Sequence, residues 1–410
     1  FFKTKEEIIL KEINLRVGND NGNSEHKMII EGELIVQPNV YADVRKLPLL
    51  DDINIDACIN DIQNNLIVSI DSPALGTSGT YFIGTYAIST GHMLKNIGVG
   101  AANSKFNSDI PIINTISRIA GYAAKKAYLE DNSVEKVKVN VEMTTGLPVN
   151  QYSKNKAFDF AKKFMDGTHN ATVIAGLKRI NVEIKFVYVK ALPESTPSIF
   201  YLQSRKAKDP IFKTFNELNN LNVNGDYFKD KRILHCAIGE GTTEFPLTID
   251  IDFDPNFIEG TNNGIGHAIN RVLNDFKKAN FLTKFSRQEY SIAIKDADHK
   301  FHDKAIDFVY NEVRDESQVI FETLEEQIEK ANNLVDIVMI HGGGSILAKK
   351  FIYDKLVELG KERGILIYYL DGMDAVSLEV KGMYEFVNGE IFDYIKKQYI
   401  NKAKAEKQVE

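Results

Sequence analysis

Cysteine and long hydrophobic runs are almost missing from this sequence. Its two cysteines, Cys58 and Cys236, lie far apart and have no metal-ligand spacing around them, so neither a disulfide scaffold nor a zinc site is expected. No apolar run approaches the 18 residues of a membrane-spanning helix, and the first residues have neither the order nor the cleavage site of a signal peptide. We therefore expect a protein of the reducing cytoplasm with no membrane partner. Because the sequence does not begin with Met, we also expect a trimmed N-terminus.

An excess of positive charge is also missing. The 57 acidic residues outnumber the 50 Lys and Arg residues, which gives a formal net charge of -7 and a pI near 5.8. Binding along a nucleic acid needs clustered Lys and Arg to neutralise the phosphates. The composition therefore argues against a broad nucleic-acid surface, and any link to DNA would go through a partner protein.

The length and composition are those of an ordinary globular protein. The chain has 410 residues, which favours two domains, each large enough to bury a core. Hydrophobic residues make up 43% and charged residues 26%, so neither extensive disorder nor a fibrous repeat is indicated. Alternating strand and helix patterns place the chain in the mixed α/β class.

Periodicity predicts the elements of the first half. Strands expected at 13–17 and 28–36 flank a polar turn and form a hairpin. Apolar residues at helical spacing predict a helix at 112–130, and strict alternation predicts a strand at 137–144. The remaining expected elements are a helix at 154–166, a strand at 182–189, a helix at 197–206 and an exposed Asn-rich loop at 216–226.

The second half repeats this opening. A buried strand is expected at 232–238, followed by a glycine turn and a second strand at 244–251. The later elements are helices at 264–279, 287–294, 300–314 and 316–332, a strand at 335–340, a helix at 346–360 and a strand at 364–370. Residues 401–410 have no apolar stripe and are expected to be disordered.

One glycine-containing hairpin turn opens each half. The turns are Asp20-Asn21-Gly22-Asn23-Ser24 and Gly239-Glu240-Gly241-Thr242-Thr243, about 220 residues apart. Glycine and small hydroxyl residues leave backbone N–H groups accessible to anionic oxygens, and Lys27 can add a positive charge after the first turn. Each turn alone is most often structural. The duplicated pair predicts a clamp for a polyphosphate.

A third glycine turn follows the strand expected at 335–340. In His341-Gly342-Gly343-Gly344-Ser345, a buried strand meets three glycines and then a helix, which lets the backbone approach a phosphate or a flat ligand. The later glycine of the dinucleotide fingerprint is absent and no βαβ unit begins there, so a Rossmann site is disfavoured. A strand-end turn without a ligand is the alternative.

Five segments, read in order, resemble the phosphate-1, connecting, catalytic, phosphate-2 and adenosine motifs of the actin superfamily. They are Asp20-Asn21-Gly22, Thr144-Thr145-Gly146-Leu147-Pro148, Leu192-Pro193-Glu194-Ser195, Gly239-Glu240-Gly241-Thr242-Thr243 and Gly342-Gly343-Gly344-Ser345. Within the superfamily, the resemblance is greatest to ParM-type proteins. It rests on the Thr-Gly-Leu-Pro and Pro-Glu-Ser sequences, on the short chain length and on Tyr81-Phe82-Ile83-Gly84. The resemblance covers roughly residues 13–390.

This resemblance implies an α/β fold with two related ribonuclease-H-like domains around a central nucleotide cleft. Domain I would span 12–196, with an inserted subdomain at about 47–135. Domain II would span 197–374, with an inserted subdomain at about 261–334. Residues 375–400 would form C-terminal helices that return to domain I.

The resemblance also implies the chemistry of the cleft. Members of the family hydrolyse ATP, and often GTP, with Mg²⁺ bridging the β- and γ-phosphates while a carboxylate or amide orients the attacking water. Glu194 matches the water-orienting residue, Asp20 the carboxylate that holds magnesium through water, and Lys27 a phosphate-binding lysine. The glycine turns match nucleotide contacts, and Arg287 and Glu289 match contacts to the base.

One position departs from the family pattern. The second phosphate loop of the family usually begins Asp-x-Gly, whereas Ala237-Ile238-Gly239 stands here. The missing carboxylate implies weakened hydrolysis with nucleotide binding largely retained. The alternatives are slow or differently organised hydrolysis in the natural protein and an engineered change that holds the triphosphate state.

The function implied is that of a filament-forming protein that segregates plasmid DNA through a DNA-binding adaptor. Nucleotide binding would drive polymerisation and hydrolysis would destabilise the filament. Two alternatives are open, the first of them with the same fold. One is a small-molecule kinase, although no sugar-binding motif is present; the other is a nucleotide-gated binding module without hydrolysis, which Ala237 favours.

Overall fold

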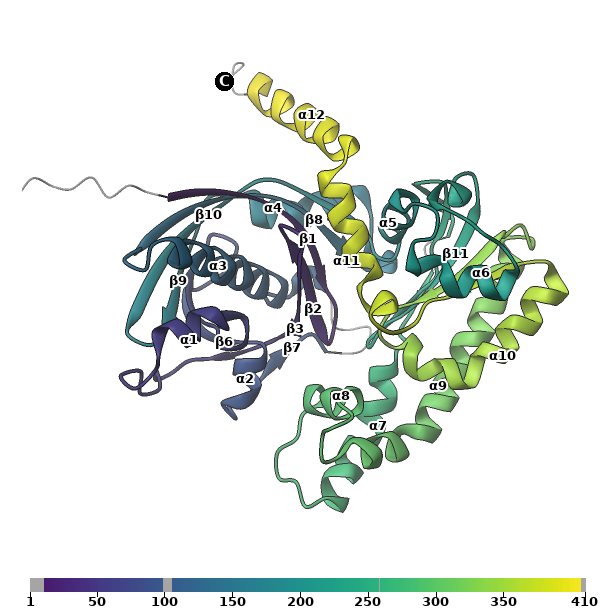
Figure 1. Ribbon diagram of the computed structural model, residues 1–410, viewed down its shortest axis with the longest axis horizontal. Helices are drawn as coiled ribbons and strands as arrows, with labels where there is room; N and C mark the ends of the chain where they lie inside the picture. Colours follow the sequence, from purple (N-terminus) through teal and green to yellow (C-terminus); the bar gives the residue numbers. More distant parts are fainter. Residues whose placement is uncertain (1–10, 99–104, 258, 407–410) are drawn as a thin grey trace, which may run out of the picture.

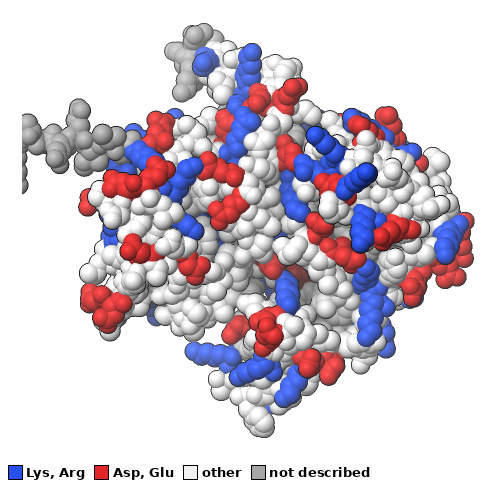
Figure 2. Space-filling view, in the orientation of Figure 1, with Lys and Arg blue, Asp and Glu red and all other residues white. Residues whose placement is uncertain are grey.

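The computed structural model describes residues 11–98, 105–257 and 259–406. Within these residues the strands form two sheets, one of ten strands and one of seven, and helices pack against both (Figure 1). No helix of the described chain is long and apolar enough to cross a membrane. Acidic and basic side chains are interspersed over the face that Figure 2 displays.

The first sheet contains the first hairpin. Its strands, in spatial order, are β3 (Glu33–Pro38), β2 (Glu25–Ile30), β1 (Lys11–Asn21), β8 (Lys136–Leu147), β10 (Lys178–Pro193), β9 (His169–Ala175), β5 (Ile67–Asp71), β6 (Gly79–Ile83), β4 (Val40–Asp43) and β7 (Lys95–Asn96). β1, β8 and β10 are parallel neighbours, so the segments that follow them meet at one edge of the sheet, where ligands of α/β proteins commonly bind. The segment 47–135, expected as an inserted subdomain, contributes β5, β6 and β7 to this same sheet.

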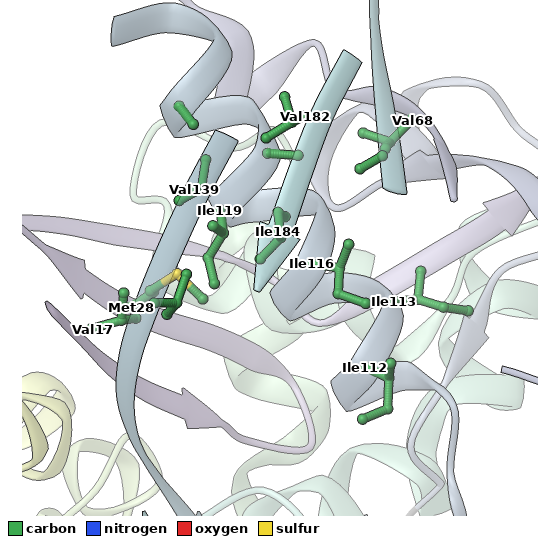
Figure 3. Close-up of a cluster of buried hydrophobic side chains, with 14 of the residues drawn as sticks. Val17, Met28, Val68, Ile112, Ile113, Ile116, Ile119, Val139, Val182 and Ile184 are labelled. Atoms are coloured by element: carbon green, nitrogen blue, oxygen red, sulfur yellow. The ribbon is translucent and has the colours of Figure 1, made fainter. Parts of the chain in front are cut away.

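Helix α3 (Ile110–Glu130) fills the core of the first half. Its buried isoleucines recur at helical spacing and pack against apolar side chains of β1, β2, β5, β8 and β10 (Figure 3). The residues labelled there are Val17, Met28, Val68, Ile112, Ile113, Ile116, Ile119, Val139, Val182 and Ile184. The other helices of this half are α1 (Ile55–Asn60), α2 (Thr85–Ser89) and α4 (Lys154–Met165), with 3₁₀ turns η1 (Ile62–Asn64), η2 (Lys105–Asn107) and η3 (Val149–Gln151).

The second sheet is built around β11 (Arg232–Ile238). This strand pairs in parallel with β16 (Ile337–His341), which pairs in parallel with β17 (Leu366–Tyr369). The shorter strands are β12 (Thr243–Glu244), β13 (Leu247–Ile249), β14 (Asp252–Phe253) and β15 (Gly260–Thr261). The helices are α5 (Ser198–Ser204), α6 (Lys213–Asn219), α7 (Ile265–Ala279), α8 (Arg287–Lys295), α9 (His302–Lys330) and α10 (Ser345–Arg363), with 3₁₀ turns η4 (Pro210–Phe212) and η5 (Gly225–Phe228).

Two C-terminal helices complete the chain. α11 (Gly372–Asn388) runs between the two halves and packs against β1, β8 and α5 (Figure 1). α12 (Glu390–Glu406) then extends away from it, and its Asp393 forms an ion pair of 2.6 Å with Arg16 of β1. The expectation of disorder from residue 401 is wrong for 401–406, because α12 meets no Gly or Pro and continues through them. Residues 407–410 lie outside the described chain.

Three predictions for the chain after residue 215 are wrong. The two helices expected at 300–314 and 316–332 are one helix, α9, since its buried stripe continues from Val313 to Ile320 without a breaker. The strand expected at 244–251 is divided into β12 and β13 around Pro246, which has no N–H to donate to a sheet. The Asn-rich segment 216–226 is partly helical and partly buried, with Val223 in the core.

Gly382 of α11 offers a test of this packing. A Cβ at Gly382 would overlap the carbonyl oxygen of Pro197, so alanine must push α11 away from the start of α5. Gly382→Ala should therefore destabilise the protein by about 2 kcal/mol through overpacking, although alanine normally favours a helix. Thermal unfolding measures this, with Gly76→Ala as the control because its added Cβ meets nothing within 4 Å. Equal melting temperatures for the two variants would contradict the close approach.

Candidate functional site

A cavity of about 750 Å³ lies between the two halves. The predicted residues that line it are Asp20, Asn21, Gly22, Asn23, Ser24, Lys27, Glu194, Gly239, Glu240, Gly241, Thr242, Gly342, Gly343 and Gly344. Both hairpin turns, the turn after β10 and the triple-glycine turn therefore converge on one space. Asp20 and Gly241, which come from different halves, face this common cavity.

The first turn joins β1 to β2 and is held by buried polar side chains. Nζ of Lys27 lies 3.1 Å from Oδ2 of Asp20, its register partner across the hairpin. Burial opposes the charge of Lys27, but the carboxylates of Asp20 and Glu25 outweigh it and raise the lysine pKa. Asn39 donates from Nδ2 to the carbonyl of Gly22 at 2.7 Å and from its backbone N–H to the carbonyl of Ser24 at 2.7 Å. The turn is thus fixed from behind while its residues face the cavity.

The second turn follows β11 and touches the first. It is closed by a bond of 2.9 Å from the N–H of Gly239 to the carbonyl of Thr242. Gly241 has no room for a side chain, because a Cβ there would overlap the side chain of Asn23 from the first turn. Thr243 does not line the cavity; it is buried and its hydroxyl donates to the carbonyl of Asn263.

The triple-glycine turn links β16 to α10. Gly342 adopts φ +91°, a conformation open to glycine, and the N–H of Gly344 donates to the carbonyl of Ile238 at 2.9 Å. Gly343 has open space where a side chain would be. Ser345 is fully buried and donates to the carbonyl of Gly342 at 2.8 Å, so it holds the turn and does not line the cavity.

Glu194 lies directly after β10 and faces the cavity, as the sequence suggested. Its Oε1 lies 2.6 Å from Nζ of Lys105, whose side chain is almost fully buried. Burial raises the pKa of Glu194, while the ammonium group of Lys105 acts in the opposite direction. Sequence reasoning missed Lys105 because a single lysine before a helix has no distinctive pattern.

Two further carboxylates, Glu244 and Glu379, line the same cavity and were also missed. Oε2 of Glu244 accepts from the N–H of Val149 at 3.1 Å, and its Oε1 has no hydrogen-bond partner among the described residues. Burial and the nearby charge of Glu194 raise the pKa of Glu244 to about 8.

Glu379 comes from α11 and accepts from the N–H of Ser195 at 3.0 Å. Its pKa lies well above the usual range because of burial and the charges of Asp20 and Glu194.

Helix α8 lines the cavity, but the residues that do so are not the two that the sequence predicted as base contacts. Arg287 forms an ion pair of 2.7 Å with Glu240 and donates to the carbonyl of Ile97. Glu289 caps the helix, accepting from the N–H of Ser286 at 2.7 Å. Neither Arg287 nor Glu289 lines the cavity. The lining residues from α8 are Ser291, Ile294 and Lys295, and the apolar lining beside them comes from Ile265, Ile269, Ile346 and Leu347.

Ala237 lines the cavity at the end of β11, paired in register with Glu244 and His341. Burial lowers the pKa of His341 to about 4, so its imidazole is neutral near pH 7. Among the residues that the structure describes, no three His, Cys, Asp or Glu side chains are grouped so that they could hold a metal ion by themselves.

Comparisons with known proteins bear on the fold. Residues 18–196 match the family model of the actin-like proteins' N-terminal domain. The fold is similar to that of the actin-like protein Alp7A, with a TM-score of 0.64 and 17% identity over 97% of this chain and 100% of that one. It is also similar to Bacillus thuringiensis ParM with AMPPNP (TM-score 0.56, 17% identity, 91% and 98% covered) and to the archaeal actin homologue Ta0583 (0.58, 14%, 91% and 99%). No curated protein matches the sequence significantly.

Because these sequence identities are low, the solved structures show only the fold. The family match applies to residues 18–196. The predicted actin-like fold is therefore confirmed, and residues 18–196 match the N-terminal domain of the actin-like proteins.

Proposed function

We propose that this protein binds a nucleoside triphosphate with magnesium in the cavity, polymerises into filaments in the cytoplasm and segregates plasmid DNA through a DNA-binding adaptor. The observation that carries the proposal is the meeting of two glycine hairpin turns from different halves, Asn23 against Gly241, at one cavity. A ligand gripped by both turns would link the two halves. Nucleotide binding would then favour one arrangement of the halves, and hydrolysis another.

The cavity suits a nucleotide in size and in lining. Its volume of about 750 Å³ lies within the ordinary range of ligand pockets. The glycine turns and Lys27 offer N–H groups and a cation to the phosphates. Ile269, Ile294 and Leu347 offer an apolar slot to the base, with Ser291 and Lys295 as polar groups beside it.

The acidic lining also fits a magnesium ion held with the phosphates. Asp20 is only 6% exposed and faces the cavity. Magnesium in such sites uses one or two carboxylates together with phosphates and waters, and we assign the water-mediated contact to Asp20. When bound, the ion would supply positive charge that offsets the charge developing on the phosphates. Glu194 would orient the attacking water, with Lys105 holding its carboxylate.

Polymerisation is supported by relatives of the same fold. One of them is a non-polymerisable quadruple mutant of pCBH ParM, at a TM-score of 0.56 and 17% identity, which implies that its parent protein polymerises. Bacillus thuringiensis ParM has been solved with ATP, ADP and AMPPNP. Assembly and ATP binding are therefore the properties to test first in this chain.

Nucleotide-dependent assembly is the direct test of the function. We expect light scattering and sedimentable protein above a critical concentration with ATP or GTP, and longer-lived assemblies with a non-hydrolysable analogue. Phosphate transfer to an added acceptor without scattering would favour a small-molecule kinase instead. Nucleotide binding with neither phosphate release nor sedimentation would favour a binding module.

Lys105→Met tests the role of the ion pair with Glu194. Glu194 must be ionised to orient water, so hydrolysis should fall as pH drops through its pKa. Because Lys105 lowers that pKa, its loss should move the acid limb of the rate profile to higher pH and reduce hydrolysis at pH 7. Lys163→Met is the control, since Lys163 donates to the nearby carbonyl of Phe106. An unshifted acid limb in Lys105→Met would refute the role.

Ala237→Asp tests whether the departure at this position limits turnover. Ala237 lines the cavity, so an aspartate would add a carboxylate close to where magnesium and phosphates are proposed to lie. We expect phosphate release to rise about tenfold or more, the scale on which one well-placed polar group acts. Ala237→Asn adds a similar volume without the charge and should give no gain. Unchanged release in Ala237→Asp would show that hydrolysis is organised differently.

A further inference from the structure

Helix α11 touches three segments that form the cavity wall. The carbonyl of Ala375 accepts from the N–H of Gly342 at 2.9 Å, which ties the helix to the triple-glycine turn. Gly18, two residues before Asp20, lies so close that a Cβ there would be 2.7 Å from the backbone nitrogen of Tyr384. Gly382 lies against Pro197, just beyond the turn that contains Glu194. One helix therefore contacts the triple-glycine turn, the strand that leads to Asp20 and the segment that follows Glu194.

Glu379 is the carboxylate that α11 directs at this last turn. Its Oε1 accepts from the N–H of Ser195 at 3.0 Å. Ser195 has φ +72°, a left-handed conformation that costs a non-glycine residue about 1 kcal/mol or more. Such a conformation persists only when neighbouring contacts hold it. Glu379, 184 positions away in the sequence, supplies such a contact.

The turn held in this way carries Glu194. The backbone N–H of Glu194 donates to the carbonyl of Leu147 at 2.8 Å, and its carboxylate is paired with Lys105. Gly146 leaves room for this arrangement, because a Cβ there would lie 3.0 Å from Cγ of Glu194 and 3.5 Å from Oε1 of Glu379. The direction of the Glu194 side chain thus depends on contacts on both sides of its peptide unit.

We propose that Glu379 is a positioning residue for nucleotide hydrolysis: it holds the backbone of Ser195 and thereby aims Glu194 at the attacking water. This inference rests on the proposed function. The required property is a hydrogen-bond acceptor at Oε1, not a negative charge. Burial and the charges of Asp20 and Glu194 hold the pKa of Glu379 well above its usual range, which makes the neutral acid, and hence glutamine, its chemical equivalent.

The test compares three variants of the full chain. Glu379→Gln keeps a hydrogen-bond acceptor, whereas Glu379→Met keeps most of the side-chain bulk without an acceptor. Glu385→Met is the control: Glu385 lies on the same helix, pairs with Arg205 and does not line the cavity. Affinity is measured with a fluorescent ATP analogue in the presence of magnesium, and the rate by single-turnover hydrolysis at saturating ATP.

We expect Glu379→Gln and Glu385→Met to hydrolyse within about twofold of the unmodified protein. Glu379→Met should lose about tenfold to a hundredfold in rate, the effect of a small misplacement of a reacting group, while its nucleotide affinity changes by less than about threefold. Replacing Ser195 by glycine in the Glu379→Met background should restore part of the rate, since glycine adopts positive φ without strain.

Three results would overturn the role of Glu379. They are normal hydrolysis by Glu379→Met, an equal loss in Glu379→Gln, and a parallel loss in Glu385→Met. If Glu379→Met does not fold, as judged by its thermal unfolding, the same comparison is made with Glu379→Ala and its Ser195→Gly double variant. Unmodified protein that binds no nucleotide would instead overturn the proposed function.

Discussion

Six carboxylates and three lysines line the cavity between the halves, and the cost of placing their charges there constrains the surrounding structure. Asp20 is paired with Lys27 and Glu194 with Lys105. Glu244 and Glu379 have no such cation, and each pKa is raised by burial. Unpaired buried charges are expensive, so these two acids are held near neutrality and serve as hydrogen-bond acceptors. The protonation state of each acid in the site is therefore set by the groups around it and not by whether it is Asp or Glu.

The same region joins the two halves of the protein. Besides the contact between Asn23 and Gly241, Lys295 pairs with Glu25 at 2.7 Å, and Asn96 donates to Gln288 at 3.1 Å. These polar contacts cross between the two halves. Polar contacts of this kind can be exchanged for others without opening a hydrophobic core, which suits a cleft whose two sides must change their relative position as a ligand is bound or altered.

Many elements of the fold follow from local patterns. The strand expected at 137–144 lies within β8, and the strand expected at 232–238 coincides with β11, because alternation and short buried runs reflect burial directly. The errors arose where a strand was interrupted or where a helix continued through an expected boundary. Pro246 divided a predicted strand, and an uninterrupted apolar stripe joined two predicted helices into α9. Side-chain spacing alone does not record such breaks.

For the site, the sequence by itself determined the three glycine turns, Asp20 and Glu194, because a turn needs particular residues at adjacent positions. Only the tertiary structure decided what completes the cavity. Lys105 reaches the cavity from the 3₁₀ turn η2 before α3, and Glu379 reaches it from α11. Arg287 instead forms an ion pair with Glu240, and Glu289 caps helix α8. The physical reason is distance along the chain: residues separated by many tens of positions meet through packing, and no local pattern encodes that meeting.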